Sequence, residues 1–223
     1  MRTRLLLYWY HGRLGLSWGS VVPVLALIGT ITTLSLVTPR GERGHDLFVA
    51  LEGGMPMVAA FLAAPLLMSE REHLTLWWSA TRTSLVGIVV VRLVVLSLYL
   101  LACCGVTLLV AGMLWHITLS WEPLMRGGTR ALTFAGIALL ASSWGRAPVY
   151  GYIASTALWL GVLMFGALVP QREPWLTFNP FAWSAGYDSH IVAHSMTVYA
   201  ALGLGLLLLQ RPLLRPERLL RRA

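Results

Sequence analysis

The chain has 223 residues, of which 57% are hydrophobic and only 12% are charged, and its mean hydropathy is +0.70. A soluble domain typically carries about 25% charged residues, so this composition excludes a water-soluble globular domain. It predicts an all-α membrane protein with a single transmembrane domain over residues 1–223. The net charge is +8 and every basic residue is an arginine. Because the arginines flank apolar runs, they indicate contact with membrane lipid, and we expect no nucleic-acid partner.

Six apolar runs follow one another along the chain, each near the roughly 20 residues that a helix needs to span ~30 Å of hydrocarbon. They predict transmembrane helices at residues 16–37, 47–68, 85–112, 129–143, 149–169 and 191–209. The fourth run is the shortest. Before the first run, residues 1–15 are basic and aromatic, which predicts an uncleaved interfacial helix. The connecting segments that matter most are a polar loop at 69–82, a mixed aromatic and proline-rich segment at 170–190, and a basic tail at 210–223.

The arginine distribution predicts the orientation of the chain. Six crossings place both termini on one side, and that side then holds most of the arginines outside the apolar runs. Because arginine-rich segments stay in the cytoplasm, both termini and the 69–82 loop are expected to be cytoplasmic. The expected location is the cell membrane, and specifically a bacterial inner membrane. If the 129–143 run did not cross, the arginines of the tail would lie on the opposite side.

Two charged residues fall well inside the predicted spans, where a charge at mid-helix costs at least ~2.5 kcal/mol on insertion scales. Glu52 lies near the outer end of the second span, and we expect it either to reach the headgroups or to line a cavity. Arg92 lies in the third span near the inner face, and we expect its side chain to extend toward the cytoplasmic surface. Their depths differ too much for the two residues to pair with each other. A proton or ion relay would need several such groups at one depth, and the sequence does not show them.

No motif for nucleophilic catalysis, metalloprotease chemistry or nucleotide binding occurs in the sequence. The chain is therefore not expected to be an enzyme or to hold a cofactor of its own. His190 and His194 have a spacing that could hold a metal, but no third strong ligand is evident, and interfacial polar residues are the better interpretation. The adjacent Cys103 and Cys104 are read as small residues inside a helix.

The segment from Pro65 to Leu93 resembles the loop after the second span of ABC-2 type permeases, the membrane subunits of many ABC exporters. The family has a cluster of serine, arginine and glutamate followed by Gly-Thr-Leu and a turn into the third helix. The matching positions here are Ser69, Glu70, Arg71, Glu72, Thr75 and Leu76. Two positions depart from the family pattern, since Leu74 stands where glycine is usual and Arg92 lies near where lysine is usual.

A second resemblance lies between the fifth and sixth spans. There the family has an outer segment that ends in Asn-Pro followed by leucine or phenylalanine and an aromatic residue. The corresponding positions are Trp175, Asn179, Pro180, Phe181 and Trp183. In the family this segment forms short re-entrant helices, so the resemblance implies an outer re-entrant segment at 170–190.

The resemblance implies a mechanism and a set of partners. Loop 69–82 would be a coupling helix that docks on a cytoplasmic ATP-binding subunit, present in two copies per complex. ATP and Mg would be bound by that subunit and not by this chain. A second permease subunit, identical or homologous, would complete a dimer. The substrate would be amphiphilic, such as a lipid, a drug or a peptide, and the chain would have no enzymatic activity alone.

Two other functions remain open from the sequence. A haem-handling permease of the cytochrome c maturation type is also small with six spans, and His190, His194 and the tryptophan-rich outer segment are compatible with it. A membrane scaffold or immunity protein that only binds a partner would need no ATPase. If the purified protein is indifferent to added haem, that result argues against the haem-handling permease. If its bound partner lacks ATPase activity, that result favours the scaffold or immunity protein.

Overall fold

The computed structural model describes residues 18–37, 43–67, 85–115, 121–165 and 189–209, and within these ranges the protein is all-helical with no strand. The elements are α2 (Trp18–Val37), α3 (Arg43–Ala63), the 3₁₀ helix η1 (Ala64–Leu67), α5 (Leu85–Trp115), α6 (Glu122–Gly145), α7 (Pro148–Phe165) and α8 (Ser189–Leu209). The predicted all-α class is therefore confirmed for the described part of the chain.

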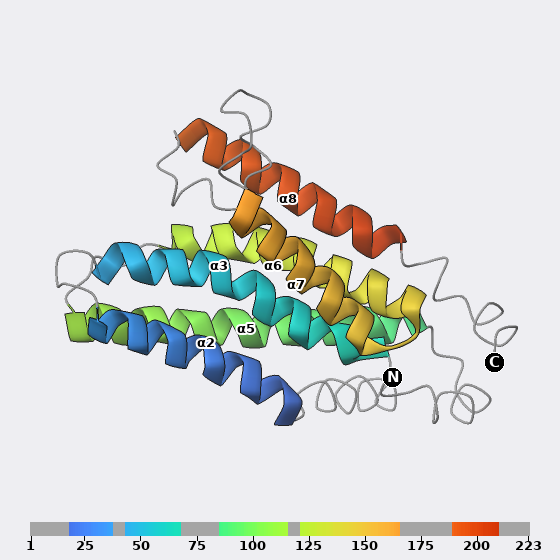
Figure 1. Cartoon of the computed structure of the whole chain (residues 1–223), viewed down its shortest axis with the longest axis horizontal. Coiled ribbons are helices and arrows are strands. Elements are labelled where there is room, and N and C mark those ends of the chain that lie inside the picture. Colours follow the sequence, from blue (N-terminus) through green and yellow to red (C-terminus); the bar gives the residue numbers. More distant parts are fainter. Residues whose placement is uncertain (1–17, 38–42, 68–84, 116–120, 166–188, 210–223) are drawn as a thin grey trace, which may run out of the picture.

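The helices form an elongated bundle in which successive helices run in opposite directions (Figure 1). The first residues of α2, the end of η1, the turn between α6 and α7 and the last residues of α8 lie at the same end of the bundle. That turn is tight, because Arg146 adopts a left-handed conformation (φ 61°) and the Tyr150 amide donates to the Ala147 carbonyl at 3.2 Å.

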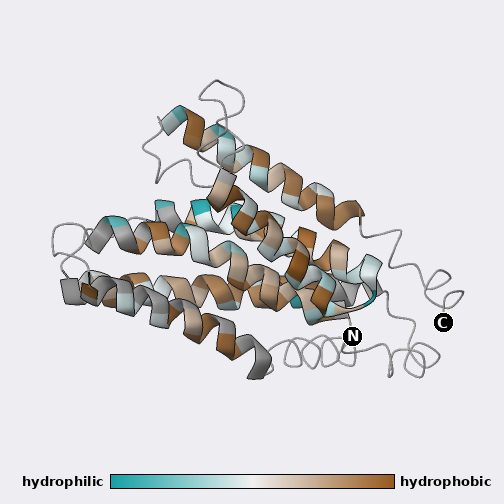
Figure 2. Cartoon of the chain, viewed as in Figure 1, coloured by the Kyte–Doolittle hydropathy of each residue, from teal (hydrophilic) through white to brown (hydrophobic). Residues whose placement is uncertain are grey.

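Three of the described helices are long and apolar enough to cross a membrane: Val49–Leu66, Val90–Met113 and Ser189–Leu209. Pro148–Met164 forms a shorter apolar helix. Hydrophobic residues recur along all the helical ribbons in Figure 2, and many large ones are exposed, such as Val94 and Leu98 on α5 and Leu204 on α8. An apolar surface of this extent is stable against lipid and not against water, which indicates a membrane-embedded protein.

The fourth predicted span differs from the observed helix. The sequence predicted a short span at 129–143 after a loop, whereas α6 begins at Glu122 and continues for 24 residues. Pro123 lies in the first turn, where proline lacks only an amide hydrogen that would be unpaired anyway. The predicted span begins only at residue 129 because Arg126, Gly127 and Gly128 interrupt the apolar residues before it. These residues are nevertheless helical and largely buried.

Helix α6 is the centre of the bundle and packs against α3, α8 and α7. Glycines allow the closest of these approaches. A Cβ atom at Gly203 of α8 would lie 2.9 Å from the backbone nitrogen of Thr133, and a Cβ atom at Gly151 of α7 would lie 2.5 Å from the Ala138 carbonyl oxygen. Both α8 and α7 therefore contact the backbone of α6 directly.

Several predicted features lie outside the described residues. These are the interfacial helix at 1–15, the coupling loop at 69–82 with Ser69, Glu70, Arg71, Glu72, Thr75 and Leu76, the tail at 210–223, and the outer segment at 170–190 with Trp175, Asn179, Pro180, Phe181 and Trp183, except for its last two residues, which begin α8.

Candidate functional site: a buried charge pair at the centre of the bundle

A buried ion pair joins α3 to α6. The Arg130 Nη1 atom donates a hydrogen bond to the Glu52 Oε1 atom, and the two side chains are 0% and 1% exposed. Glu52 therefore neither reaches a surface nor lines the cavity described below. Separating the two side chains would leave two uncompensated buried charges, which is strongly unfavourable. The pair therefore favours the one arrangement of α3 and α6 in which Glu52 lies beside Arg130.

A third helix, α8, also contacts this ion pair. The guanidinium carbon of Arg130 lies 5.9 Å from the centre of the Tyr199 ring, within the range of a cation–π interaction. One turn further along α6, the buried Thr133 hydroxyl donates to the Tyr199 carbonyl oxygen at 2.5 Å. Charged and polar contacts thus tie together three helices that are distant in sequence.

A second ion pair lies toward the start of α6. The Arg126 Nη2 atom donates to the Glu122 Oε1 atom four residues earlier. The Arg126 side chain is only 5% exposed, whereas the Glu122 side chain is 59% exposed. Since Arg126 and Arg130 are four residues apart, they lie on the same face of the helix. The positive charge on this face extends from the buried centre toward the first turn of α6.

The pairing of Arg130 with Glu52 leaves polar atoms without hydrogen bonds. The Nε and Nη2 atoms of Arg130 and the Oε2 atom of Glu52 are buried and have no hydrogen-bond partner in the structure. An unsatisfied buried polar atom costs about 1–3 kcal/mol, and more when it belongs to a charged group. Buried polar atoms without partners are rare in proteins, so the three atoms of this pair call for a physical explanation.

Arg92 does not reach the cytoplasmic surface as the sequence suggested. It is 2% exposed, and its Nη1 atom donates to the Leu66 carbonyl oxygen at 3.1 Å. The carbonyls at the end of a helix lack partners within the helix and carry partial negative charge, which makes them a favourable site for a cation. The expectation was wrong because η1 presents such a carbonyl within reach of the guanidinium inside the bundle.

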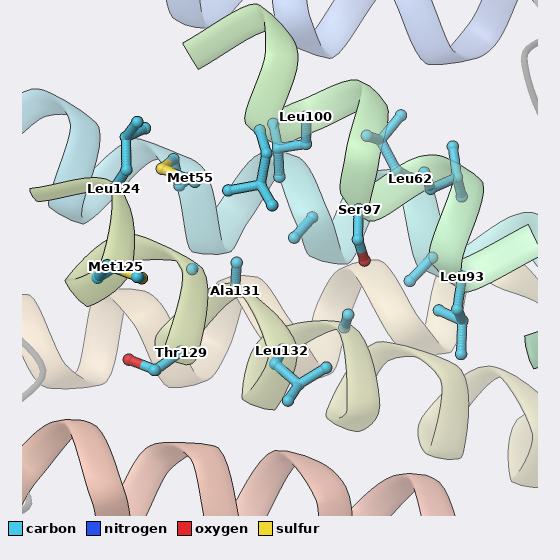
Figure 3. Close-up of a pocket in the computed structure, with 16 residues that line it drawn as sticks. Met55, Leu62, Leu93, Ser97, Leu100, Leu124, Met125, Thr129, Ala131 and Leu132 are labelled. Atoms are coloured by element: carbon cyan, nitrogen blue, oxygen red, sulfur yellow. The ribbon is translucent and has the colours of Figure 1, made fainter. Parts of the chain in front are cut away.

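An apolar cavity of about 320 Å³ lies between α3, α5 and α6 (Figure 3). Figure 3 shows Leu62 of α3, Leu93 and Ser97 of α5 and Leu132 of α6 among the residues around it. The volume is at the lower end of the roughly 300–1,000 Å³ of small-molecule pockets. The cavity offers shape and apolar contact but little polar recognition.

The histidine pair of α8 lies at the surface. The rings of His190 and His194 are 5.1 Å apart and both residues are exposed. Among the described residues, no group of three or more histidine, cysteine, aspartate or glutamate side chains could hold a metal ion. Cys103 is partly buried and Cys104 is buried, and both are free thiols.

The sequence singled out Glu52 but missed its partner. The sequence pattern puts Arg130 at the outer end of a short span that begins at residue 129, and Arg126 in the loop before it. One signal could have found the pair: both residues lie a few turns inside helices that run in the same direction, so their depths match (Figure 1).

No protein-family profile, no curated protein and no solved structure matches this chain.

Proposed function

We propose that the protein is the transmembrane subunit of an ATP-driven ABC exporter of the ABC-2 type, with six membrane crossings and both termini in the cytoplasm. It moves an amphiphilic substrate and takes its energy from a separate ATP-binding subunit that docks on residues 69–82. It is not itself an enzyme, and it works as a dimer with a second permease subunit. The proposal rests on the motif resemblance around residues 69–82, on the alternating helix directions and on one contact.

The contact that carries the proposal is the hydrogen bond from Arg92 to the Leu66 carbonyl oxygen. Leu66 precedes the proposed coupling segment and Arg92 belongs to the helix that follows it. A subunit that pulls on residues 69–82 therefore pulls on η1 and α5 together. Without this link, the two helices could move independently and part of the displacement would be lost.

Two further contacts extend this path through the bundle. The continuous α3–η1 segment is bound to α6 by the Glu52–Arg130 pair, and α6 is bound to α8 by the hydrogen bond from Thr133 to the Tyr199 carbonyl. Displacement at one end of the bundle is thereby passed to four helices. Interfaces of this kind have discrete arrangements and not a continuous range of them, as an alternating-access transporter requires.

The first step of the test identifies the docking partner. A photo-crosslinking amino acid is placed at residue 72 and, for comparison, at residue 146, in the exposed turn between α6 and α7, which lies at the same end of the bundle as the end of η1. The protein captured from residue 72 should be an ATPase. Capture of a partner without ATPase activity would favour a scaffold or immunity protein.

The second step measures coupling in the reconstituted complex. We expect Glu72→Arg to abolish coupled ATP hydrolysis, because it reverses a charge at the proposed docking surface. Arg146→Glu reverses a charge in the other turn and should leave coupling unchanged. Unchanged coupling in Glu72→Arg would count against the proposal, provided that both variants elute from gel filtration as the parent protein does.

A further inference from the structure

We propose that Arg130 is the binding site for an anionic headgroup, phosphate or carboxylate, on an apolar tail, and that Glu52 occupies this site in the closed conformation as an internal counter-ion. As a substrate site, this inference rests on the proposed function and names the charge of the exported amphiphile. As a binding site, it depends only on the residues described here.

The geometry of the guanidinium group is the first argument. Arg130 uses Nη1 for Glu52, and the two atoms without partners are Nε and Nη2. These two atoms lie on one edge of the planar guanidinium and point their hydrogens in parallel. That edge is the one on which arginine binds a carboxylate or a phosphate through two hydrogen bonds. The protein has therefore left open the edge best suited to an anion.

The burial of Glu52 is the second argument. Its Oε1 atom accepts from Arg130, while its Oε2 atom is buried with no partner. A carboxylate that served only to stabilise the bundle would be expected to satisfy both oxygens, since each unsatisfied atom is costly. A carboxylate that must leave when an anion arrives has reason to be held by a single bond.

The surroundings of Arg130 suggest a route. Tyr199 of α8 covers the guanidinium, and α8 contacts α6 through Gly203 and Gly136, so the site opens only when α8 moves away from α6. Arg126 lies one turn nearer the start of α6, about 6 Å along the axis, and the N-terminal end of a helix is itself favourable for anions. An anion that leaves Arg130 toward this end passes Arg126, whose guanidinium pairs with the exposed Glu122 in the first turn of α6.

The test is a titration of the purified full-length protein in dodecyl maltoside with dodecyl phosphate, with bound molecules counted by native mass spectrometry. Dodecylphosphocholine has the same tail and a phosphate neutralised by choline, and inorganic phosphate has no tail. We expect Glu52→Gln to bind dodecyl phosphate at least about tenfold more tightly than the parent, the effect of removing one competing charge-assisted bond. Neither control compound should show this gain.

Matched variants separate binding from folding. Glu52→Gln/Arg130→Gln removes both charges of the pair and should keep the fold, yet it should lose the tighter binding of dodecyl phosphate. Arg146→Gln removes an exposed arginine from the other end of α6 and should bind as the parent does. The inference is overturned if Glu52→Gln binds no more tightly than the parent, or if the double variant binds as tightly as Glu52→Gln.

A competition arm identifies the source of the headgroup. Displacement of dodecyl phosphate by phosphatidylglycerol assigns the site to a membrane lipid, and failure to displace it assigns the site to a single-chain anionic amphiphile. The titration contains no ATPase. A negative result would therefore remove the anion site and leave the proposed function standing, while a failed coupling test at residue 72 would leave the anion site untouched.

Discussion

The indole nitrogen of Trp159, on α7, donates a hydrogen bond to the backbone carbonyl oxygen of Gly53, on α3, at 3.0 Å. This acceptor is one residue beyond Glu52, so the middle of α3 is held from two sides, by α7 at Gly53 and by α6 at Glu52. A backbone carbonyl already bonded within a helix uses its second lone pair here. The contact thereby fixes the backbone that presents the carboxylate to Arg130.

Trp159→Phe should weaken this attachment. The substitution keeps an aromatic ring but removes the donor, and we expect a loss of about 0.5–1.5 kcal/mol in the free energy of unfolding. The measurement is thermal unfolding in dodecyl maltoside followed by size-exclusion chromatography. Trp144 is exposed, and Trp144→Phe is the matched control that should leave the midpoint unchanged. Equal shifts in the two variants would show that the hydrogen bond to Gly53 is not the cause.

The Glu52–Arg130 pair predicts strong non-additivity. Arg130→Met leaves the Glu52 carboxylate buried without its counter-charge and should cost about 3–5 kcal/mol. Glu52→Leu should be damaging for the same reason, while the double variant should recover most of the loss because it leaves neither charge of the pair without its partner.

The three variants and the parent form a double-mutant cycle, measured by unfolding in SDS–dodecyl maltoside mixtures. A coupling energy near zero would mean that the two side chains do not stabilise the bundle as a pair.

Two glycines of α7 should respond in opposite ways to alanine. A Cβ atom at Gly151 would lie 2.2 Å from the Ser142 hydroxyl oxygen and 2.5 Å from the Ala138 carbonyl, whereas a Cβ atom at Gly161 meets nothing within 4 Å. Gly151→Ala should therefore force α7 away from α6 at a cost of about 1–3 kcal/mol. Gly161→Ala should be neutral or stabilise by up to about 1 kcal/mol through helix propensity.

Chromatographic thermal stability of the two glycine variants provides the comparison. If Gly151→Ala were as stable as Gly161→Ala, the close approach of α7 to the α6 backbone would be wrong.

Arg92 should matter for the junction between η1 and α5. Arg92→Met keeps much of the apolar stem but leaves the Leu66 carbonyl without this donor, and the expected loss is about 1–3 kcal/mol. Arg92→Lys retains a cation and should recover part of it. Protease sensitivity of the 68–84 segment and the midpoint of thermal unfolding are the readouts, with Arg146→Met as the exposed control. A midpoint that falls equally in the control would attribute the effect to lost surface charge.

The sequence predicted the helices whose apolar runs are uninterrupted. α5 and α8 match their predicted spans closely, since neither contains more than one charged residue. α6 was predicted only from residue 129, because Arg126 and the two glycines after it make the start of the helix look like a loop when each residue is judged alone. The sequence pattern thus puts Arg126 in a loop and Arg130 at the end of a span. Their burial becomes possible only when Glu122, Glu52 and the ring of Tyr199 are added, and two of these belong to other helices.

The candidate site shows the same difference between local and distant information. Glu52 could be singled out because a charged carboxylate inside an apolar run is energetically costly. Its partner is 78 residues away, and no local spacing relates the two positions. Arg92 was misjudged in a similar way: its sequence context favours a side chain that reaches the surface, and the Leu66 carbonyl that binds it belongs to another helix.

The position of Arg130 also bears on how the protein enters its membrane during synthesis. In the proposed topology, in which α6 crosses the membrane, α6 is a poor insertion sequence by itself, since arginine near the middle of a span opposes partitioning from the translocon by roughly 2.5–3.5 kcal/mol. Its neutralising partner, Glu52, lies on α3, which leaves the ribosome earlier. Glu52 is therefore already in the membrane when Arg130 is synthesised. We expect α6 to leave the translocon only after it has packed against α3, so that the two charges can pair. A truncated chain that lacks α3 should leave α6 unintegrated.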